Sequence, residues 1–320
     1  MSKNWALIST SSGWGASNMG TGVGAHTIFY SFDPLNLNPD RFDRTFFKKS
    51  YHIDAHPEGI TIAKLPFCST NGEMRFAHVL NTVQEVYEYT IDSLDCGLNP
   101  FVLGGDHSIA VGTWSAIRQY HQKDFGLIWI DAHLDSHTPE TSPSQARHGM
   151  PLAALMGYGD CELTSIGSEE PKLKPENLVI IGARSFEKGE QDLLVQLGVR
   201  IIYMEEIHQR GFAACFGEAV AMLTKNGQHF GISFDVDAFD PNIAPGTGAA
   251  EPNGLLENDV ISAMNGILNH EQLLGFELVE FNPALDIQDK TLNLIWRFVY
   301  SIKGEREWKS LKLPHQLGQG

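Results

Sequence analysis

Two carboxylates and a histidine at alternate positions are the residues of this sequence best suited to chemistry: Asp131, His133 and Asp135. They directly follow residues 125–130, a short apolar run that is typical of a buried strand. If the chain stays extended, alternate side chains project to the same side, so we expect the three to share one face. Such a cluster needs a cation, and carboxylate plus imidazole suits Mn, Co, Ni, Zn or Fe better than Ca or Mg. The alternative is a polar loop in which these residues cluster by accident.

Further candidate ligands follow two other apolar runs. His107 comes after residues 101–103, and Asp235 and Asp237 come after residues 230–234. Because ligands bind outside the carboxyl ends of parallel strands, we expect these side chains to meet at one edge of a sheet. Four carboxylates and two imidazoles are too many for one ion but suit two ions that share bridging carboxylates. Two such ions can activate water as a nucleophile at neutral pH.

The elements that must position these groups alternate between strands and helices. Continuous apolar strands separated by helices indicate an α/β fold with a mostly parallel sheet covered on both faces. We expect strands at residues 5–9, 60–63, 101–103, 125–130, 178–184, 199–203, 229–234 and 273–281. We expect helices at residues 74–94, 109–120, 152–156, 187–197, 212–224, 257–268 and 291–303.

No linker, compositional break or internal repeat divides the sequence, so we expect one domain over residues 1–320. The glycine-rich segment 13–24 lacks the GxGxxG spacing of a dinucleotide loop and the lysine of a P-loop, which argues against phosphate binding. We expect this segment to be a flexible loop at the sheet edge or at the mouth of a site. Residues 158–176 are expected to form a surface loop, and the polar tail from Gly304 to be loosely held.

The composition indicates a globular protein with a large core, since 42% of its residues are hydrophobic and 19% are charged. A formal net charge of −16 argues against nucleic acid or an anionic membrane surface as a partner. Neither a signal peptide nor a membrane-spanning run is apparent, so we expect a cytoplasmic protein. The cysteines form no CxxC pair and are expected to be buried free thiols in a reducing compartment: Cys68, Cys96, Cys161 and Cys215.

Three motifs resemble the signature motifs of the ureohydrolase family of arginases and agmatinases, with arginases closest. They are GGDHS at residues 104–108, DAHLD at 131–135 and SFDVDAFDP at 233–241, in the family's order and spacing. The resemblance covers roughly residues 100–300. It implies a three-layer α/β/α fold, a homo-oligomer (trimer or hexamer) and a site for two manganese ions, with Co or Ni as possible substitutes.

The resemblance also assigns the ligands. One ion would be held by His107, Asp131, Asp135 and Asp235. The other would be held by Asp131, His133, Asp235 and Asp237, so that Asp131 and Asp235 bridge the two. A metal-bridging hydroxide would then attack a guanidinium carbon. Asp135 would orient that hydroxide and help to pass its proton to the leaving amine.

Two more residues match catalytic positions of the family. His148 matches a histidine with a proton-shuttle role, and Glu280 matches a glutamate that anchors the substrate guanidinium. A carboxylate can bind a planar guanidinium through two parallel hydrogen bonds. The alternative for His148 is a loop histidine whose ring is satisfied by hydrogen bonds. The alternative for Glu280 is an ordinary salt bridge at a strand end.

The substrate tail is expected to meet the loop that begins at His137. Residues 138–149 look like the arginase loop that recognises the amino-acid end of the substrate, with Ser142 and Ser144 as hydroxyl donors. Glu187 falls where arginases carry an aspartate near the substrate α-amino group. The alternative for Glu187 is a solvated carboxylate at a helix start.

Some residues depart from the arginase pattern. His137 stands where arginases usually offer asparagine to the substrate carboxylate, and residues 145–146 are Gln-Ala where a Gly-Asn pair is usual. Residues 244–252 look more like agmatinases, but Ala249 replaces a threonine that is usual in both. We expect hydrolysis of L-arginine to L-ornithine and urea. The alternatives are an agmatinase or other guanidino-acid hydrolase, a formiminoglutamase-type hydrolase, an amide deacylase, or a metal-binding protein without catalysis.

Overall fold

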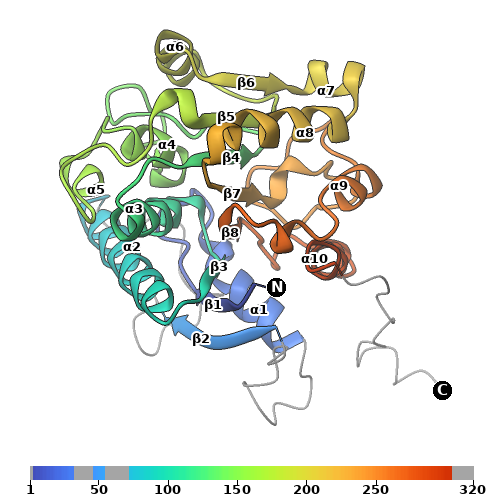
Figure 1. The fold of residues 1–320 in the computed structure, drawn as a ribbon, viewed down its shortest axis with the longest axis horizontal. Coiled ribbons are helices and arrows are strands. Elements are labelled where there is room, and N and C mark those ends of the chain that lie inside the picture. Colours follow the sequence, from blue (N-terminus) through green and yellow to red (C-terminus); the bar gives the residue numbers. More distant parts are fainter. Residues whose placement is uncertain (1–2, 32–45, 55–71, 305–320) are drawn as a thin grey trace.

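The computed structural model describes residues 3–31, 46–54 and 72–304 (Figure 1). Eight strands form one sheet in the order β2-β1-β3-β8-β7-β4-β5-β6, and neighbouring strands pair in parallel throughout. The strands are β1 (Trp5–Thr10), β2 (Phe47–Ile53), β3 (Asn99–Leu103), β4 (Gly126–Ile130), β5 (Leu178–Ala183), β6 (Arg200–Tyr203), β7 (Phe230–Asp235) and β8 (Leu273–Val279). The expected α/β fold with a parallel central sheet is confirmed.

The helices pack in two layers, one on each face of the sheet (Figure 1). Alternate residues of β4 serve the two faces: Ile128 and Ile130 pack with α8, α9 and α10, whereas Leu127 and Trp129 pack with α3 and α4. The helices are α1 (Gly24–Ser31), α2 (Gly72–Asp95), α3 (Ala110–His121), α4 (Pro151–Leu155), α5 (Cys161–Thr164), α6 (Lys188–Leu197), α7 (Met204–Arg210), α8 (Phe212–Leu223), α9 (Glu257–Ala263) and α10 (Lys290–Ile302).

The structure differs from the sequence-based elements at several points. Strand β2 was not expected, because it is an edge strand with alternating exposed residues that pairs only with β1. Helix α7 was not expected either; it is short and ends at Arg210, directly before Gly211, whose φ is 82°. The expected helix 257–268 ends instead at Ala263, and a separate 3-10 turn covers Ile267–Asn269. The predicted strand at 60–63 lies outside the described residues.

Two further expectations are corrected. The surface loop 158–176 contains the short helix α5. Cys96 and Cys161 are exposed free thiols, whereas Cys215 is buried as expected; Cys68 lies outside the described residues. In the part of the chain that the structure describes, no helix combines the length and apolar character needed to cross a membrane.

The first part of the glycine-rich segment is packed against the rest of the protein. Residues 11–16 are buried, and the Gly15 N–H donates to Asp106 Oδ2 at 3.1 Å. A Cβ at Gly15 would collide with the Asp106 and Ser108 side chains, so glycine permits this close approach. The Gly15 carbonyl accepts from the His148 N–H at 3.2 Å, which places the segment beside the candidate site.

Candidate metal centre and substrate site

The candidate ligands gather because four neighbouring strands end at the same edge of the sheet. Strands β3, β8, β7 and β4 are adjacent in that order. Asp131 follows β4, and Asp235 is the last residue of β7. His107 begins a 3-10 turn after β3, and the Asp106 side chain caps this turn by accepting from the Ser108 N–H at 3.1 Å. Glu280 follows β8.

The first ligand group surrounds one histidine nitrogen. His107 Nδ1 lies 3.2 Å from Asp131 Oδ2, 3.0 Å from Asp135 Oδ2 and 3.1 Å from Asp235 Oδ2. This nitrogen is buried and makes no hydrogen bond among the described residues. A buried nitrogen without a hydrogen bond among three carboxylate oxygens is the donor set that a transition-metal ion requires. The four side chains are those expected to hold one ion.

The second group shares a residue with the first. His133 Nδ1 lies 3.4 Å from Asp131 Oδ1 and 3.1 Å from Asp237 Oδ2. The two oxygens of Asp131 therefore face different histidines. Asp235 Oδ1 accepts from the Asp237 N–H at 2.7 Å, and its other oxygen faces His107.

Convergence does not depend on a continued strand. Strand β4 ends at Ile130, and Asp135 has a φ of 44°, in the left-handed region. The expectation that residues 131–135 stay extended is therefore wrong, although its outcome, a shared site, is right. The chain turns at Asp135, and this turn brings the carboxylate back to His107.

The electrostatics of the site call for positive charge. Burial, followed by the negative charge of neighbouring carboxylates, raises the pKa of Asp235 well above its usual range. The same two causes, with Asp131 as the neighbour, raise the pKa of Asp135 to about 7. Burial also raises the pKa of Asp237. A divalent cation would offset both the burial and the repulsion, so the residues fit a metal centre.

A buried chain of hydrogen bonds orients His107 from behind. His107 Nε2 lies 2.8 Å from Ser233 Oγ, and this hydroxyl donates to Glu277 Oε1 at 2.8 Å. Thr113 Oγ1 donates to the other oxygen of Glu277 at 2.6 Å. Since Ser233 gives its proton to Glu277, it accepts from the His107 Nε2–H, which leaves Nδ1 unprotonated and able to bind a metal. The sequence analysis did not identify Ser233 or Glu277, although Ser233 lies inside the third motif.

Ser233→Ala is expected to weaken Mn(II) binding by about 10–100-fold, the usual effect of losing a group that orients a ligand. The measurement is the dissociation constant in competition with a chelator. Ser93→Ala is the matched control, because Ser93 is also buried but bonds only the Thr90 carbonyl within α2. Equal metal affinity of the two variants would contradict the role of Ser233.

Arg184 secures the loop that carries the second ligand group, and sequence reasoning missed it. Its guanidinium donates to the carbonyls of Asp237 at 2.7 Å and Glu251 at 2.9 Å, and its Nε donates to the Pro252 carbonyl at 3.1 Å. Arg184 therefore fixes the Asp237 backbone against residues 251–252. No sequence signal marked it beyond its place directly after β5.

His148 and Glu280 are in direct contact. His148 Nδ1 lies 3.0 Å from Glu280 Oε1, and the same oxygen accepts from the His107 N–H at 2.9 Å. Burial would lower the pKa of His148, but the charge and hydrogen bond of Glu280 outweigh it and raise that pKa to about 9. Glu280 directly follows β8 and has a φ of 67°, a backbone conformation that non-glycine residues rarely adopt.

The residues expected to bind the substrate tail fall into two sets: a hydrogen-bonded pair, and two serines that bond within their own loop. His137 Nε2 lies 3.0 Å from Glu187 Oε2, and Nδ1 lies 3.1 Å from Thr141 Oγ1. By contrast, Ser142 Oγ accepts from the Gln145 N–H at 3.0 Å and Ser144 Oγ accepts from the Ala146 N–H at 3.2 Å. Both serine oxygens thus serve their own loop, while their hydroxyl protons remain available to an acceptor.

Glu190 completes the His137 cluster, and the sequence analysis missed it. Glu187 caps the start of α6, and its N–H donates to Glu190 Oε1 at 2.9 Å. The same Glu190 oxygen lies 3.7 Å from His137 Nε2. Burial raises the pKa of Glu190 to about 8. A capping box usually has Ser or Thr at the cap and Glu three residues later. Here Glu187 takes the cap position, so this pattern did not mark Glu190 in the sequence.

Comparison with known proteins now identifies the family. The sequence model of the Arginase family matches residues 36–304. The chain belongs to the arginase family. It is 33% identical over 306 residues to an arginase of Brevibacillus brevis, covering 96% of this chain and 99% of the relative. It is 37% identical over 260 residues to an arginase of Bacillus caldovelox, covering 80% and 86%.

The fold agrees with this assignment. The crystal structure of arginase from Bacillus cereus superposes with a TM-score of 0.82 at 32% identity, covering 96% of this chain and 100% of that one. As a member of the arginase family, the protein is a hydrolase that acts on the C–N bonds of linear amidines. Its metal-ligand groups lie where the strand ends of this fold converge.

Proposed function

We propose that the protein hydrolyses L-arginine to L-ornithine and urea with two Mn(II) ions per chain, for which Co or Ni can substitute. The observation that carries this proposal is the presence of two ligand groups that share Asp131, together with a separate hydrogen-bonded pair, His137 and Glu187. The ligand groups suit guanidinium hydrolysis, and the His137–Glu187 pair suits the α-carboxylate and α-amino group of an amino acid. The relatives named arginase support this choice of substrate.

The chain's own residues bind the reacting end of the substrate. Two divalent ions held by these ligand groups would supply a water activated as a nucleophile at neutral pH. Glu280 holds the guanidinium and so aligns its carbon with the ligand groups; Glu280 and His107 are already joined through the His107 N–H. Asp135 orients the water and accepts its proton, and His148 moves a proton to the leaving amine. Burial of the ligand groups excludes bulk water and strengthens these interactions.

At the other end of the substrate, His137 and the loop hydroxyls bind the carboxylate. The Ser142 and Ser144 hydroxyls can donate to it, and Glu187 can accept from the ammonium group. A site built to hydrogen-bond a carboxylate rejects a substrate that lacks one, because its polar groups are left unpaired.

Arginine is therefore expected to exceed agmatine in kcat/KM by roughly 10⁴-fold, a ratio typical of sites built around one polar group. The assay is urea release from arginine, agmatine, guanidinobutyrate and guanidine. His137→Ala and Ser144→Ala should raise KM for arginine and leave the bound metal unchanged. Equal or better turnover of agmatine would overturn the choice of arginine and leave the metal chemistry standing.

We also propose a cytoplasmic homo-oligomer, trimer or hexamer, whose partner in function is the small guanidino substrate. The net charge of −16 supports the absence of nucleic acid and anionic membrane partners. A formiminoglutamase-type reaction on the same centre remains the second candidate, and the substrate series decides between them if it is extended to formiminoglutamate.

A further inference from the structure

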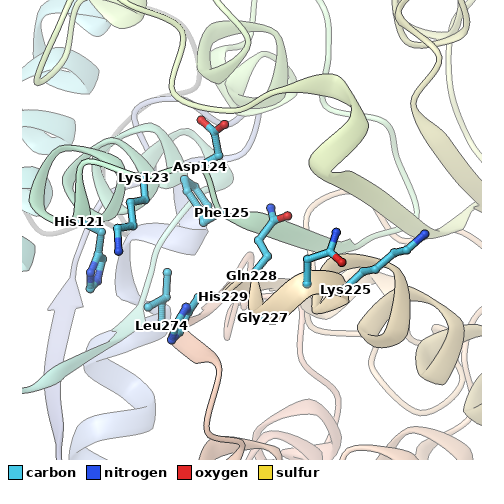
Figure 2. A pocket seen from close by; sticks show the side chains of 10 residues that line it. His121, Lys123, Asp124, Phe125, Lys225, Gly227, Gln228, His229 and Leu274 are labelled. Carbon is cyan, nitrogen blue, oxygen red and sulfur yellow. The ribbon is translucent and has the colours of Figure 1, made fainter.

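A pocket separate from the metal centre lies at the edge of the sheet opposite to the metal ligands. Its volume is about 450 Å³, within the range of small-molecule sites (Figure 2). Its walls are His121 at the end of α3, residues 123–125 after this helix, residues 225–229 after α8, and Leu274 of β8. Strand β4 joins the pocket residue Phe125 to the ligand Asp131, six positions later, so the two sites are about 20 Å apart at about 3.3 Å per residue.

The pocket concentrates positive charge in an acidic protein. Two lysines, Lys123 and Lys225, line it together with the imidazoles of His121 and His229, although the whole chain carries a net charge of −16. Neither lysine forms an ion pair with any residue in the described ranges. In Figure 2, His121 and Lys123 lie side by side on one wall, and Lys225 extends from the opposite end.

The acidic residue of the lining does not neutralise this charge. The Asp124 carboxylate points away from both pocket histidines (Figure 2). Its oxygens pair with Lys174 Nζ at 2.5 Å and Arg118 NH2 at 3.9 Å. The Asp124 charge is therefore used by cations outside the lining, and the pocket stays basic.

Two nitrogens of the lining are buried without partners. His121 Nε2 and Gln228 Nε2 are both buried and make no hydrogen bond among the described residues. Such groups cost free energy unless an acceptor reaches them. Burial, and after it the charges of His229 and Lys123, lower the pKa of His121. A ligand that supplies acceptor oxygens and negative charge would satisfy both nitrogens.

The ends of two helices account for only part of this arrangement. Helices α3 and α8 end beside the pocket, and the dipole of a helix favours cations near its C-terminus. However, the last turns are already capped: the Gln122 N–H donates to the Arg118 carbonyl, and the Thr224 N–H donates to the Val220 carbonyl. The helix dipoles also do not explain why His121 Nε2 and Gln228 Nε2 are buried without hydrogen-bond partners among the described residues.

We propose that this pocket binds a small oxyanion, the carboxylate or phosphate group of a metabolite, independently of the metal centre. His121 and Gln228 would donate to the anion, and the lysines would supply the attractive field. The buried side chains of Phe125 and Leu274 would contact an apolar portion of the ligand.

The test uses the full-length protein with inorganic phosphate and succinate as probes, at constant ionic strength set with sodium chloride. Both isothermal titration calorimetry and thermal unfolding are measured. We expect saturable binding and a rise in Tm with at least one probe. Binding of phosphate alone identifies a phosphate site, binding of succinate alone a carboxylate site, and binding of both a general oxyanion site.

Variants separate this site from nonspecific salt effects. The double variant Lys123→Glu/Lys225→Glu should weaken binding at least tenfold, because it replaces two positive charges that attract the anion with two negative charges that repel it. Lys188→Glu/Lys290→Glu changes the charge equally on exposed lysines elsewhere and should retain binding. His121→Phe should also weaken binding while leaving the Tm without ligand unchanged or higher, since it removes an unpartnered nitrogen.

Two results would overturn the proposal of an oxyanion site. Equal, non-saturable Tm shifts in all variants would reflect general exclusion of the salts from the protein surface and would overturn the proposal. Failure of both probes to bind the wild-type protein at millimolar concentration would also overturn it. All of these variants should still hydrolyse the guanidino substrate, so a failure here is distinct from a failure of the proposed function.

Discussion

Asp131→Asn is expected to abolish hydrolysis and to remove both metal ions, whereas Asp237→Asn should weaken only one. The two oxygens of Asp131 face the two ligand histidines, at 3.2 Å from His107 Nδ1 and 3.4 Å from His133 Nδ1. Asp237 faces only His133. Asparagine keeps the shape of aspartate but removes the negative charge that both ions need. The loss in metal affinity should exceed about 100-fold, since groups that only orient ligands already contribute about 10–100-fold.

The measurement is metal content per chain after dialysis, together with urea release. Wild-type protein should hold two ions, lose activity with a chelator and regain it with Mn, Co or Ni. Asp192→Asn is the matched control, because this exposed carboxylate pairs with Lys188 on α6 and lies outside both ligand groups. An Asp131→Asn protein that keeps two ions, or a fully active wild-type enzyme with one ion, would contradict the proposal of a dinuclear centre.

The same experiment can distinguish the two proposed bridging residues. Asp235 was expected to bridge like Asp131, yet only its Oδ2 faces a ligand histidine, while its Oδ1 accepts from the Asp237 N–H. Asp131 Oδ1 likewise accepts a backbone N–H, from His133 at 2.7 Å, so this bond does not exclude a bridging role for Asp235. If Asp235 bridges, Asp235→Asn should also lose both ions. Retention of the ion bound by His133 would restrict Asp235 to the first group.

The candidate metal ligands could be predicted because of where they stand in the sequence. Each group directly follows an apolar strand, and parallel strands end at a common edge, so proximity follows from the fold class alone. The residues and their spacing do not predict how the ligands divide into two groups; that division came from the resemblance to ureohydrolases. In the structure it depends on the strand order, in which β7 lies between β8 and β4, and on the turn at Asp135.

Residues that act through long-range contacts gave no local signal. Ser233 and Glu277 are 44 positions apart and meet only because β7 and β8 pair. The basic pocket likewise joins two turns that are about a hundred residues apart in the chain. The missed strand β2 has another cause: its alternating exposed residues, which suit a sheet edge, hide the apolar pattern of a buried strand.

His148→Ala is expected to lower kcat by about 10²–10⁴-fold, the usual contribution of a positioned acid or base, without loss of metal. His148 Nδ1 bonds Glu280 and belongs to neither ligand group. With its pKa raised to about 9 by Glu280, the ring is protonated at neutral pH and can donate to the leaving amine. Alanine removes that donor while Glu280 remains to hold the guanidinium.

The readouts are kcat, KM and metal content measured on the same preparation. If His148 is the proton donor, wild-type activity should fall as pH rises through the pKa of this ring, because the protonated form is lost. That descending limb should be absent in His148→Ala. Glu280→Gln provides the contrast: it should raise KM, because it removes the charge that binds the guanidinium, and should lower the pKa of His148, which loses its anionic partner. A His148→Ala protein that loses metal, or that changes only KM, would show that this histidine supports the centre or binds substrate and does not transfer protons.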